Sequence, residues 1–380
     1  MRINSKLPDV GITIFTKMSK MANEHGAINL SQGFPDFPVE PKLIERVHHY
    51  MKEGHNQYAP MPGHPNLREA IAEKTQNCYG WKPDVDQNIT VTCGAIEAIM
   101  SSITALINPG DEVIIMDPAY DAYEPIINLQ GAMAVGVPLR STDYSIDWKL
   151  VWEAITKRTK MLIINSPHNP SGAIMSKGDI EVLEDIVSET GLLVLSDEVY
   201  EHIVFDQAEH QSVLRSESLR NNSIVVSSFG KTFHATGWRM GYLIAPSDLM
   251  GEIRKVHQYN TFTIHTPTQL AIADYIKDPS HYMGVSSMYE EKRDFFLSAM
   301  KDSKFVPILS QGTYFQLMNY SAISDQHDVE FAAWLTQEIG VAAIPTSVFY
   351  QDKTDNKVLR FCFAKGEETL KAAAEKLCNL

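Results

Sequence analysis

The sequence has few cysteines and no long apolar run, and each absence excludes a class of protein. No apolar run approaches the roughly 20 residues needed to span a bilayer, and residues 1–20 lack the apolar region of a signal peptide. We therefore expect a cytoplasmic protein without a membrane partner. Its four cysteines show no paired spacing for zinc and no disulfide framework, which fits a reducing compartment: Cys78, Cys93, Cys362 and Cys378.

The sequence has fewer basic than acidic residues, and it lacks the common metal-binding motifs. Lys and Arg total 33 against 47 Asp and Glu, and the formal net charge of −14 argues against a nucleic-acid partner. The thirteen histidines include no HExxH pair, so no catalytic metal is indicated. What is present is the composition of a globular protein, 44% hydrophobic and 21% charged. A length of 380 residues predicts one large domain and a smaller one.

Between residues 89 and 245 the chain alternates between short apolar, β-branched runs and helical patterns. Such alternation indicates an α/β fold with a largely parallel sheet that is buried on both faces. Sheets of this kind bind ligands at the carboxyl ends of their strands. The predicted strands are Ile89–Cys93, Glu112–Met116, Ala134–Val137, Met161–Asn165, Leu192–Ser196, Ile224–Ser228 and Gly241–Ala245, and the helices include Ala95–Ile107, Asp179–Glu189 and Leu249–Tyr259.

The segments before residue 89 and after residue 245 show other hydrophobic patterns. Ile14, Phe15, Met18 and Met21 suit one face of a short helix, and residues 29–38 read as an extended segment. Further helices are predicted from Pro41 to Gly54, over Leu67–Cys78 and over Thr268–Ile276. Beyond residue 276 we expect an α+β portion with helices Met283–Met300 and Val329–Glu338 and strands Thr313–Met318 and Val358–Phe363.

The stretch Ser227–Gly241 contains a single lysine, Lys231, between Ser228 and Arg239. A desolvated lysine near other cations is a nucleophile toward carbonyls. A hydroxyl and a guanidinium suit a phosphate dianion. An aldehyde cofactor with a phosphate, pyridoxal 5'-phosphate, meets both conditions, although a lone surface lysine is the commoner case. A nucleotide-binding loop ending in residues 230–232 is excluded, because Val225 stands where such a loop needs glycine.

Several candidates follow the predicted strands. Gly94 opens a helix whose first N–H groups form an anion site. Asn169 would lie over the sheet edge with a free amide, although Asn-Pro is also ordinary turn chemistry. Asp197 at a strand end is costly to bury without a cation, and a pyridinium nitrogen is such a partner. Tyr200 could donate to the phenolate oxygen of that ring. Capping of a turn by Asp197 remains an alternative.

Two further residues suit a cofactor and a substrate. Tyr120 follows the second strand and offers a ring to stack on a cofactor face, or belongs to the core. Arg360 lies inside an apolar strand and either faces outward or receives a carboxylate through a bidentate contact. Gly33 would let the backbone approach a ligand closely.

The ordered set of motifs resembles the fold-type I, pyridoxal-phosphate-dependent aminotransferases of class I/II over almost the whole chain. It is most similar to the methionine and the kynurenine/glutamine members of that family. The resemblance implies a large cofactor-binding domain (41–276) with a mostly parallel seven-stranded sheet, a small C-terminal α+β domain (277–380), and an N-terminal arm and small-domain segment (1–40). The motifs are SQGFPDF, NQYAPMPG, NPSG, SDEVYE, SSFGKTF, TGWRMGY and RFCFAK.

The same resemblance implies roles around the cofactor ring. Lys231 would form the internal aldimine and then move the proton between substrate and cofactor. Asp197 would pair with the pyridine nitrogen, while Tyr200 and Asn169 would bond the phenolic oxygen. Tyr120 would stack on the ring. Among these residues we predict Lys231, Asp197 and Tyr200 to be catalytic.

For the phosphate, the resemblance implies Ser228, Arg239 and the amides of Ala95 and Ile96, where many relatives carry hydroxyl residues at the helix start. Tyr58 would reach the phosphate from the neighbouring subunit, which implies a homodimer with shared active sites. The other departure from the family pattern is His168, which stands where asparagine is frequent and which we expect to be neutral.

For the substrate, the resemblance implies that Arg360 grips the α-carboxylate beside Asn169 and the Gly33 backbone. Relatives that take aspartate place a second cation after the lysine strand, but residues 256–275 contain no Arg or Lys. We therefore expect an apolar or aromatic donor, methionine first and then aromatic amino acids, kynurenine or glutamine. Phe15, Phe34, Ile96, Phe262, Ile264 and His265 are the candidate side-chain contacts, and a protonated His265 could instead accept an acidic or amide group.

Two other functions use the same scaffold. A C–S β-lyase shares the lysine, aspartate, tyrosine and arginine, so these residues do not separate it from an aminotransferase. A non-catalytic, aminotransferase-like ligand-binding domain is disfavoured, because the lysine is intact and no basic helix-turn-helix extension precedes the domain.

Overall fold

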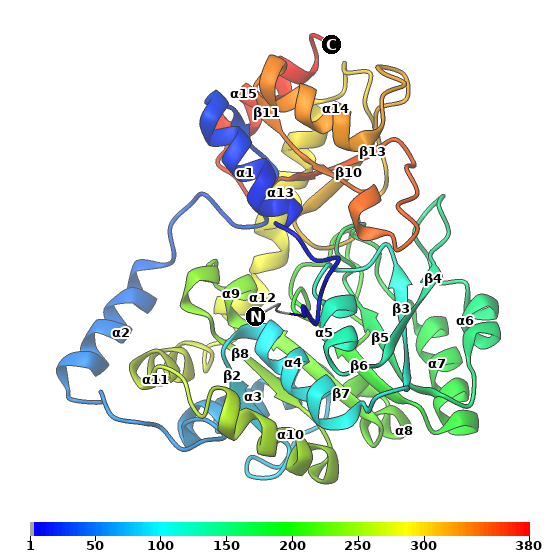
Figure 1. Ribbon diagram of the computed structural model, residues 1–380. Coiled ribbons are helices and arrows are strands. Elements are labelled where there is room, and N and C mark those ends of the chain that lie inside the picture. Colours follow the sequence, from blue (N-terminus) through cyan, green and yellow to red (C-terminus); the bar gives the residue numbers. More distant parts are fainter. Residues whose placement is uncertain (1–3) are drawn as a thin grey trace.

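The computed structural model of the protein describes residues 4–380 and is built on a seven-stranded sheet (Figure 1). The strand order is β2-β8-β7-β6-β5-β3-β4. Strand β8 runs antiparallel to both of its neighbours, whereas β7–β6, β6–β5, β5–β3 and β3–β4 are parallel pairs. The predicted α/β class and mostly parallel seven-stranded sheet are confirmed. The strands are β2 Ile89–Thr92, β3 Glu112–Asp117, β4 Met133–Pro138, β5 Thr159–Asn165, β6 Leu193–Asp197, β7 Ser223–Ser228 and β8 Gly241–Ile244.

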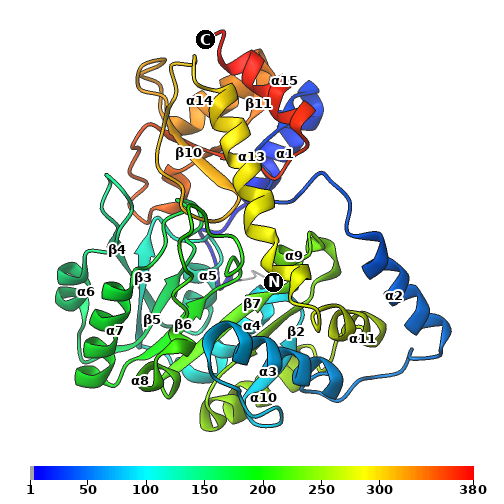
Figure 2. The ribbon, with the colours of Figure 1, turned by 180° about the vertical axis from the view of Figure 1, so that it is seen from behind.

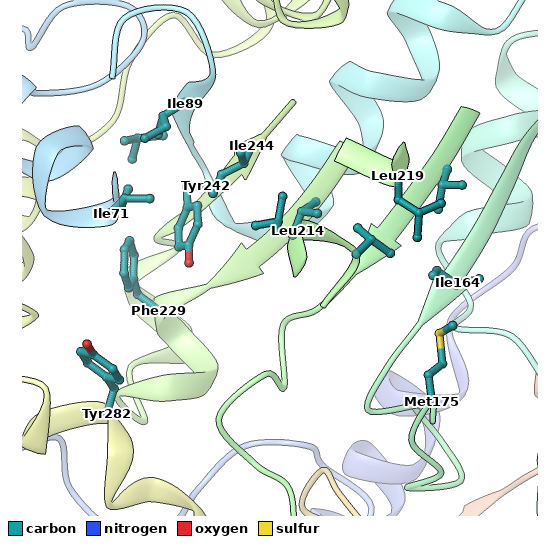
Figure 3. Packing of buried hydrophobic residues seen from close by; sticks show 14 of the residues in the cluster. Ile71, Ile89, Ile164, Met175, Leu214, Leu219, Phe229, Tyr242, Ile244 and Tyr282 are labelled. Carbon is teal, nitrogen blue, oxygen red and sulfur yellow. The ribbon is translucent and has the colours of Figure 1, made fainter. Parts of the chain in front are cut away.

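Alternate residues of each central strand enter two separate cores, because successive side chains point to opposite faces. On β3, Ile114 belongs to one core, and Val113 and Ile115 belong to the other. Figure 3 shows the first core, where Ile71 and Phe229 pack against strand residues such as Tyr242 and Ile244. Burial on both faces explains why these strands are continuously apolar.

Helices cover both faces of the sheet. Helices α3 Pro65–Tyr79, α7 Lys177–Thr190, α8 Glu217–Arg220 and α11 Thr266–Tyr275 contribute to the first core. Helices α4 Gly94–Leu106, α5 Tyr123–Leu129 and α10 Ser247–Asn260 contribute to the second. The helix α2 Pro41–Lys52 packs on α11, and α6 Trp148–Ala154 lies beside β4.

The C-terminal part of the chain forms a third core together with the N-terminal helix α1 Ile14–His25 (Figures 1 and 2). Met18 and Leu30 share this core with residues from Val285 to Leu377, and residues 199–205 of the large sheet region also contribute. The division into segments 1–40, 41–276 and 277–380 stays a prediction, and residues 1–3 lie outside the described part.

The C-terminal sheet has the order β12-β13-β10-β9, and β1 pairs with β11. Arg360 lies on its strand β13, which runs antiparallel to both β10 and β12. The remaining strands are β1 Ile28–Asn29, β9 Val306–Pro307, β10 Phe315–Asn319, β11 Val341–Ala342, β12 Ile344–Pro345 and β13 Val358–Cys362, and the helices are α9 Phe229–Thr232, α12 Ser280–Met283, α13 Val285–Ala299, α14 Asp328–Trp334 and α15 Glu367–Leu377.

Two predicted helices differ from the structure. The predicted helix Met283–Met300 is present as α13 but begins two residues later, because Gly284 separates α13 from the short helix α12. The predicted helix Val329–Glu338 changes after Trp334 into a π-helical turn, Leu335–Ile339, which ends at Gly340 in the left-handed conformation. Within residues 4–380, no helix combines the length and the apolar character needed to cross a membrane.

Candidate active site

A cavity of about 280 Å³ lies at the carboxyl ends of the parallel strands β5, β6 and β7. Asn165, Asp197 and Ser228 are the last residues of these three strands, and all three line the cavity. Twelve of the predicted site residues line the cavity: Phe15, Gly33, Ala95, Ile96, Tyr120, Asn169, Asp197, Tyr200, Ser228, Lys231, Arg239 and Arg360. The predicted contacts Phe34, Tyr58, Phe262, Ile264 and His265 do not line it.

Lys231 lies in the short helix α9, which follows β7 directly and carries the side chain into the cavity. Burial lowers the pKa of Lys231 to about 8, and the positive charges of Arg360 and Arg239 act in the same direction. A lysine with this pKa is partly neutral near pH 7–8, so its amine can attack a carbonyl or accept a proton.

Asp197 ends strand β6 and is almost fully buried. Its Oδ2 accepts a hydrogen bond of 2.7 Å from the Tyr123 hydroxyl, and its Oδ1 accepts one of 3.3 Å from the Val199 amide. Among residues 4–380 Asp197 forms no salt bridge, and burial raises its pKa to about 6. A buried carboxylate with neutral partners is the place for a cation supplied by a ligand.

An anion site lies at the first turn of α4. The N–H groups of a first helical turn have no acceptor within the helix and bind anions. The guanidinium of Arg239 lies against this turn, since a Cβ added to Gly94 would come within 2.5 Å of its Nη2 atom. Ser228, Ala95 and Ile96 line the same side of the cavity. Glycine at position 94 therefore leaves the space that the guanidinium occupies.

Arg360 is the largest fully buried side chain of the protein's described residues. Its carbon Cζ lies 3.9 Å from the centre of the Phe315 ring and 5.1 Å from that of Phe15, so aromatic faces hold the guanidinium. Its Nη1 and Nη2 donate to Asn169 Oδ1 at 2.8 Å and to the Ser31 carbonyl at 3.1 Å. Its buried Nε has no hydrogen-bond partner among the described residues.

The prediction of a free Asn169 amide is partly wrong. Its oxygen accepts the hydrogen bond from Arg360, and its backbone N–H donates to Asn165 Oδ1 at 2.8 Å. The reason is that a buried guanidinium needs acceptors, and Asn169 is the neutral acceptor beside it. This bond joins the loop after β5 to the C-terminal sheet.

The neighbouring aromatic and imidazole groups are neutral at pH 7. Burial raises the pKa values of Tyr120 and Tyr200, and burial lowers the pKa of His168 to about 4. The low pKa of His168 agrees with the expectation of a neutral side chain. Its Nδ1 lies 2.7 Å from Ser171 Oγ, so it supports the loop after β5 rather than facing the cavity.

Five predicted residues lie outside the cavity of this chain. Tyr58 is 84% exposed, and its ring stands 5.6 Å from that of Phe262. Ile264 and the exposed His265 belong to the same surface segment, and His265 Nδ1 lies 2.7 Å from Thr268 Oγ1. Their place on the surface fits the prediction that Tyr58 serves a neighbouring subunit. Phe34 is 46% exposed, and its backbone carbonyl accepts a hydrogen bond of 2.8 Å from Lys365 Nζ.

Sequence reasoning missed two tyrosines in the site. Tyr123 bonds to Asp197, and the hydroxyl of Tyr314 accepts a hydrogen bond of 2.8 Å from Lys231 Nζ. Tyr123 follows Tyr120 by three residues at the start of α5, a helix that we did not predict. Tyr314 directly precedes β10, far along the chain from the lysine. Only the three-dimensional arrangement of the C-terminal sheet brings it to the site.

These geometric features define a class of enzyme, and a comparison with protein families agrees. The family model described as aminotransferase class I and II matches residues 25–377. The chain therefore belongs to the class I/II aminotransferases, an enzyme family that generally depends on pyridoxal phosphate. The family resemblance stated from the motifs is confirmed.

Individual relatives narrow the comparison. The chain is 50% identical to methionine aminotransferase of Escherichia coli K12 over 99% of this chain and 98% of the relative. A solved E. coli methionine aminotransferase structure matches all of both chains with a TM-score of 0.98 and 50% identity. N-succinyldiaminopimelate aminotransferase of Mycobacterium tuberculosis matches all of both chains at 35% identity and a TM-score of 0.95. Human kynurenine–oxoglutarate transaminase 1 is 30% identical over 98% of this chain and 96% of its own.

Proposed function

We propose that this enzyme transfers the amino group of methionine to a 2-oxo acid with pyridoxal 5'-phosphate, in a ping-pong reaction. Aromatic amino acids, kynurenine and glutamine are the proposed further donors. The observation that carries the proposal is a single cavity that holds Lys231 with a lowered pKa, the buried Asp197 and the buried Arg360. The 50% identity to a methionine aminotransferase supports the choice of donor.

The residues of the cavity fit this cofactor. Asp197 lacks a cationic partner among residues 4–380, and a protonated pyridine nitrogen supplies one. The first turn of α4, with Arg239 packed against Gly94, suits a phosphate dianion. Ser228, Tyr120 and Tyr200 line the same cavity, where Tyr120 would face the ring and Tyr200 its phenolic oxygen.

Pyridoxal phosphate supplies an aldehyde that takes the amino group and a pyridinium ring that withdraws electrons. Lys231 would hold that aldehyde through its amine and would then hold or release a proton at the substrate Cα. Its pKa of about 8 leaves enough neutral amine to act as a base at neutral pH. Asp197 would keep the ring nitrogen protonated, and Tyr123 holds the carboxylate in place through its hydrogen bond.

Arg360 orients the substrate by its α-carboxylate. Its buried guanidinium, held by Phe315 and Phe15, is pre-arranged for a carboxylate. The cationic side chains lining the cavity are Lys231, Arg239 and Arg360, and each already has a role. A second substrate carboxylate would lack a partner, whereas the rings and Ile96 suit a thioether or an aromatic side chain.

The experiment follows the amino group. Purified, cofactor-loaded protein is incubated with methionine and a 2-oxo acid, and both products and free ammonia are measured. We expect one new amino acid for each methionine converted, without ammonia. Release of ammonia from amino acids that carry a β-thioether, without transfer to the oxo acid, would instead establish the C–S β-lyase. An inactive protein that still binds amino acids would establish the ligand-binding domain.

Lys231→Ala tests the assignment of the lysine. The variant should lose the absorbance of covalently attached cofactor but should still bind cofactor and amino acid noncovalently, because Arg239, Asp197 and Arg360 remain. Its transamination rate should fall by at least about 10²-fold, the usual contribution of a positioned general base. A rate near that of the wild type would remove Lys231 from the reaction.

A further inference from the structure

Tyr314 contacts the reactive lysine directly and has no role in the proposed function so far. The residue is fully buried immediately before strand β10. Its hydroxyl lies 2.8 Å from Lys231 Nζ and 2.7 Å from the backbone carbonyl oxygen of Gly33. One hydroxyl group therefore joins the lysine of the large sheet region to the extended segment after β1.

The two partners fix the direction of both hydrogen bonds. A carbonyl oxygen only accepts, so the single hydroxyl hydrogen of Tyr314 points to Gly33. The hydroxyl can then only accept from Lys231, and the lysine must donate an N–H. The lone pair of a neutral Lys231 amine is therefore not engaged by Tyr314 and points in another tetrahedral direction. A hydroxyl without the Gly33 contact could donate to this lone pair and block it.

Aromatic packing prevents the hydroxyl from turning away. The Tyr314 ring lies 5.2 Å from the ring of Tyr200, 5.5 Å from that of Tyr289 and 4.9 Å from that of Phe315. These are the edge-to-face and tilted distances that stabilise aromatic clusters. The position of the hydroxyl is therefore set by the core of the C-terminal part of the chain.

The same short stretch also supports the substrate side. Phe315, the next residue, stacks on the Arg360 guanidinium at 3.9 Å. A Cβ added to Gly33 would come within 2.8 Å of the Phe315 ring, so glycine is needed for this close approach. Two consecutive aromatic residues, Tyr314 and Phe315, thus contact the segment at Gly33. Tyr314 also contacts the lysine, and Phe315 contacts the carboxylate-binding arginine.

We propose that Tyr314 is a positioning residue for proton transfer by Lys231. It accepts an N–H of the amine and thereby leaves the lone pair available to the substrate Cα. Through its bond to Gly33 it also holds the segment beside Arg360. This inference rests on the proposed aminotransferase function and assigns a role to a residue outside the set predicted from the motifs.

The test compares Tyr314→Phe with Tyr289→Phe in cofactor-loaded protein. The matched control removes a buried hydroxyl from the same aromatic cluster, but one that bonds to His234 Nδ1 at 2.9 Å instead of Lys231. Single-turnover rates are measured with methionine and with α-deuterated methionine. For Tyr314→Phe we expect a rate roughly 10–100-fold lower and a larger deuterium isotope effect, because proton transfer becomes slower. Tyr289→Phe should keep the wild-type isotope effect.

A second readout does not depend on turnover. Amide hydrogen exchange of residues 29–36 should be faster in Tyr314→Phe, with and without cofactor, because the Gly33 carbonyl loses its donor. Cofactor affinity should stay unchanged. An unchanged isotope effect, equal effects in both variants, or failure of Tyr314→Phe alone to fold would overturn the inference. A wild-type protein that does not transaminate methionine or any other donor would instead overturn the proposed function.

Discussion

At the scale of single residues, the site contains two ionisable groups whose burial opposes their charged forms. Burial lowers the pKa of Lys231 to about 8 and raises the pKa of Asp197 to about 6. Both shifts mean that the cofactor-free protein is less stable when these groups are ionised. The site therefore keeps a nucleophile and a counter-ion ready at a cost to the stability of the fold.

Asp197→Asn tests this cost. The native-state pKa of the carboxyl lies above its ordinary value of 3.8, so the stability present below pH 4 is lost as the pH rises through about 6. The asparagine variant has no such loss, because its amide does not ionise, and its oxygen can still accept from Tyr123. By calorimetry of the cofactor-free proteins, we expect the variant to be more stable at pH 7.5, by at most about 3 kcal/mol, and equal to wild type near pH 4.

The same variant should be a poor enzyme when loaded with cofactor. Loss of the charge opposite the ring nitrogen should lower the turnover by about 10²-fold or more, and cofactor affinity should fall less. If the variant is not more stable at neutral pH and its turnover is unchanged, Asp197 only caps a turn.

Prediction from the sequence succeeded best at residues that stand in distinctive motifs. Lys231, Asp197 and Arg360 were placed correctly in one cavity, because each is a charged residue in a setting where charge needs a partner. Tyr123 and Tyr314 could not be found in this way. A tyrosine near apolar residues is ordinary in a core, and its hydrogen-bond partner depends on elements far apart in the chain.

At the scale of elements, the start of α4 is the part of the site with the least room. Gly94 has φ +70°, and a Cβ there would collide with the Arg239 guanidinium. Gly241 packs equally closely against the backbone of Gly94 and Ala95. Glycine at positions 94 and 241 thus leaves the space in which the strand–turn–helix unit forms the anion site.

Gly94→Ala should weaken binding of the cofactor phosphate, because Arg239 must move. The matched control is Gly191→Ala, which has φ +69° and no neighbouring atom within 4 Å of the added Cβ. Both variants should lose about 1 kcal/mol of stability through left-handed strain. We expect only Gly94→Ala to lose cofactor affinity, by roughly 10-fold or more, the scale of one charge-assisted hydrogen bond. If titrations give both variants the same affinity for the cofactor, Arg239 does not bind the phosphate.

Secondary structure was predictable where one pattern dominated. The seven large-sheet strands were found because each has a short apolar, β-branched run, and burial on both faces makes the central strands almost continuously apolar. The helix α5 was missed because its seven residues are too short for a periodic pattern. The break at Gly284 and the π-helical turn at Leu335–Ile339 depend on packing in the third core, which periodicity does not report.

At the scale of the whole molecule, the surface around Tyr58 exposes aromatic side chains that contacts within one chain do not bury. Tyr58, Tyr259 and Phe262 are exposed aromatic residues, with exposed fractions of 84%, 86% and 41%. Tyr58 lies in a loop without helix or strand. We propose that this segment completes the site of a second subunit, as the family resemblance implies.

Mixing two inactive variants tests shared sites. Tyr58→Ala and Lys231→Ala each damage a different part of the proposed composite site. After subunit exchange, a mixed dimer should contain one site with both residues intact, so activity should return toward about one quarter of wild type for random pairing. Lys231→Ala mixed with Asp197→Ala is the control, because both residues line the cavity of one chain and a partner subunit cannot replace the one that is missing. In that control a mixed dimer has no intact site, and no recovery is expected. Absence of recovery in the first mixture, with exchange shown by mass spectrometry, would contradict a shared site.

The central claim is that this aminotransferase takes an uncharged side chain. The direct measurement is kcat/KM for methionine and for aspartate with one common 2-oxo acid. An unpaired, desolvated carboxylate costs several kcal/mol, so methionine should be preferred by at least about 10²-fold. A clear preference for aspartate would contradict the account, because it would require a cation beside the substrate side chain that Lys231, Arg239 and Arg360 do not provide.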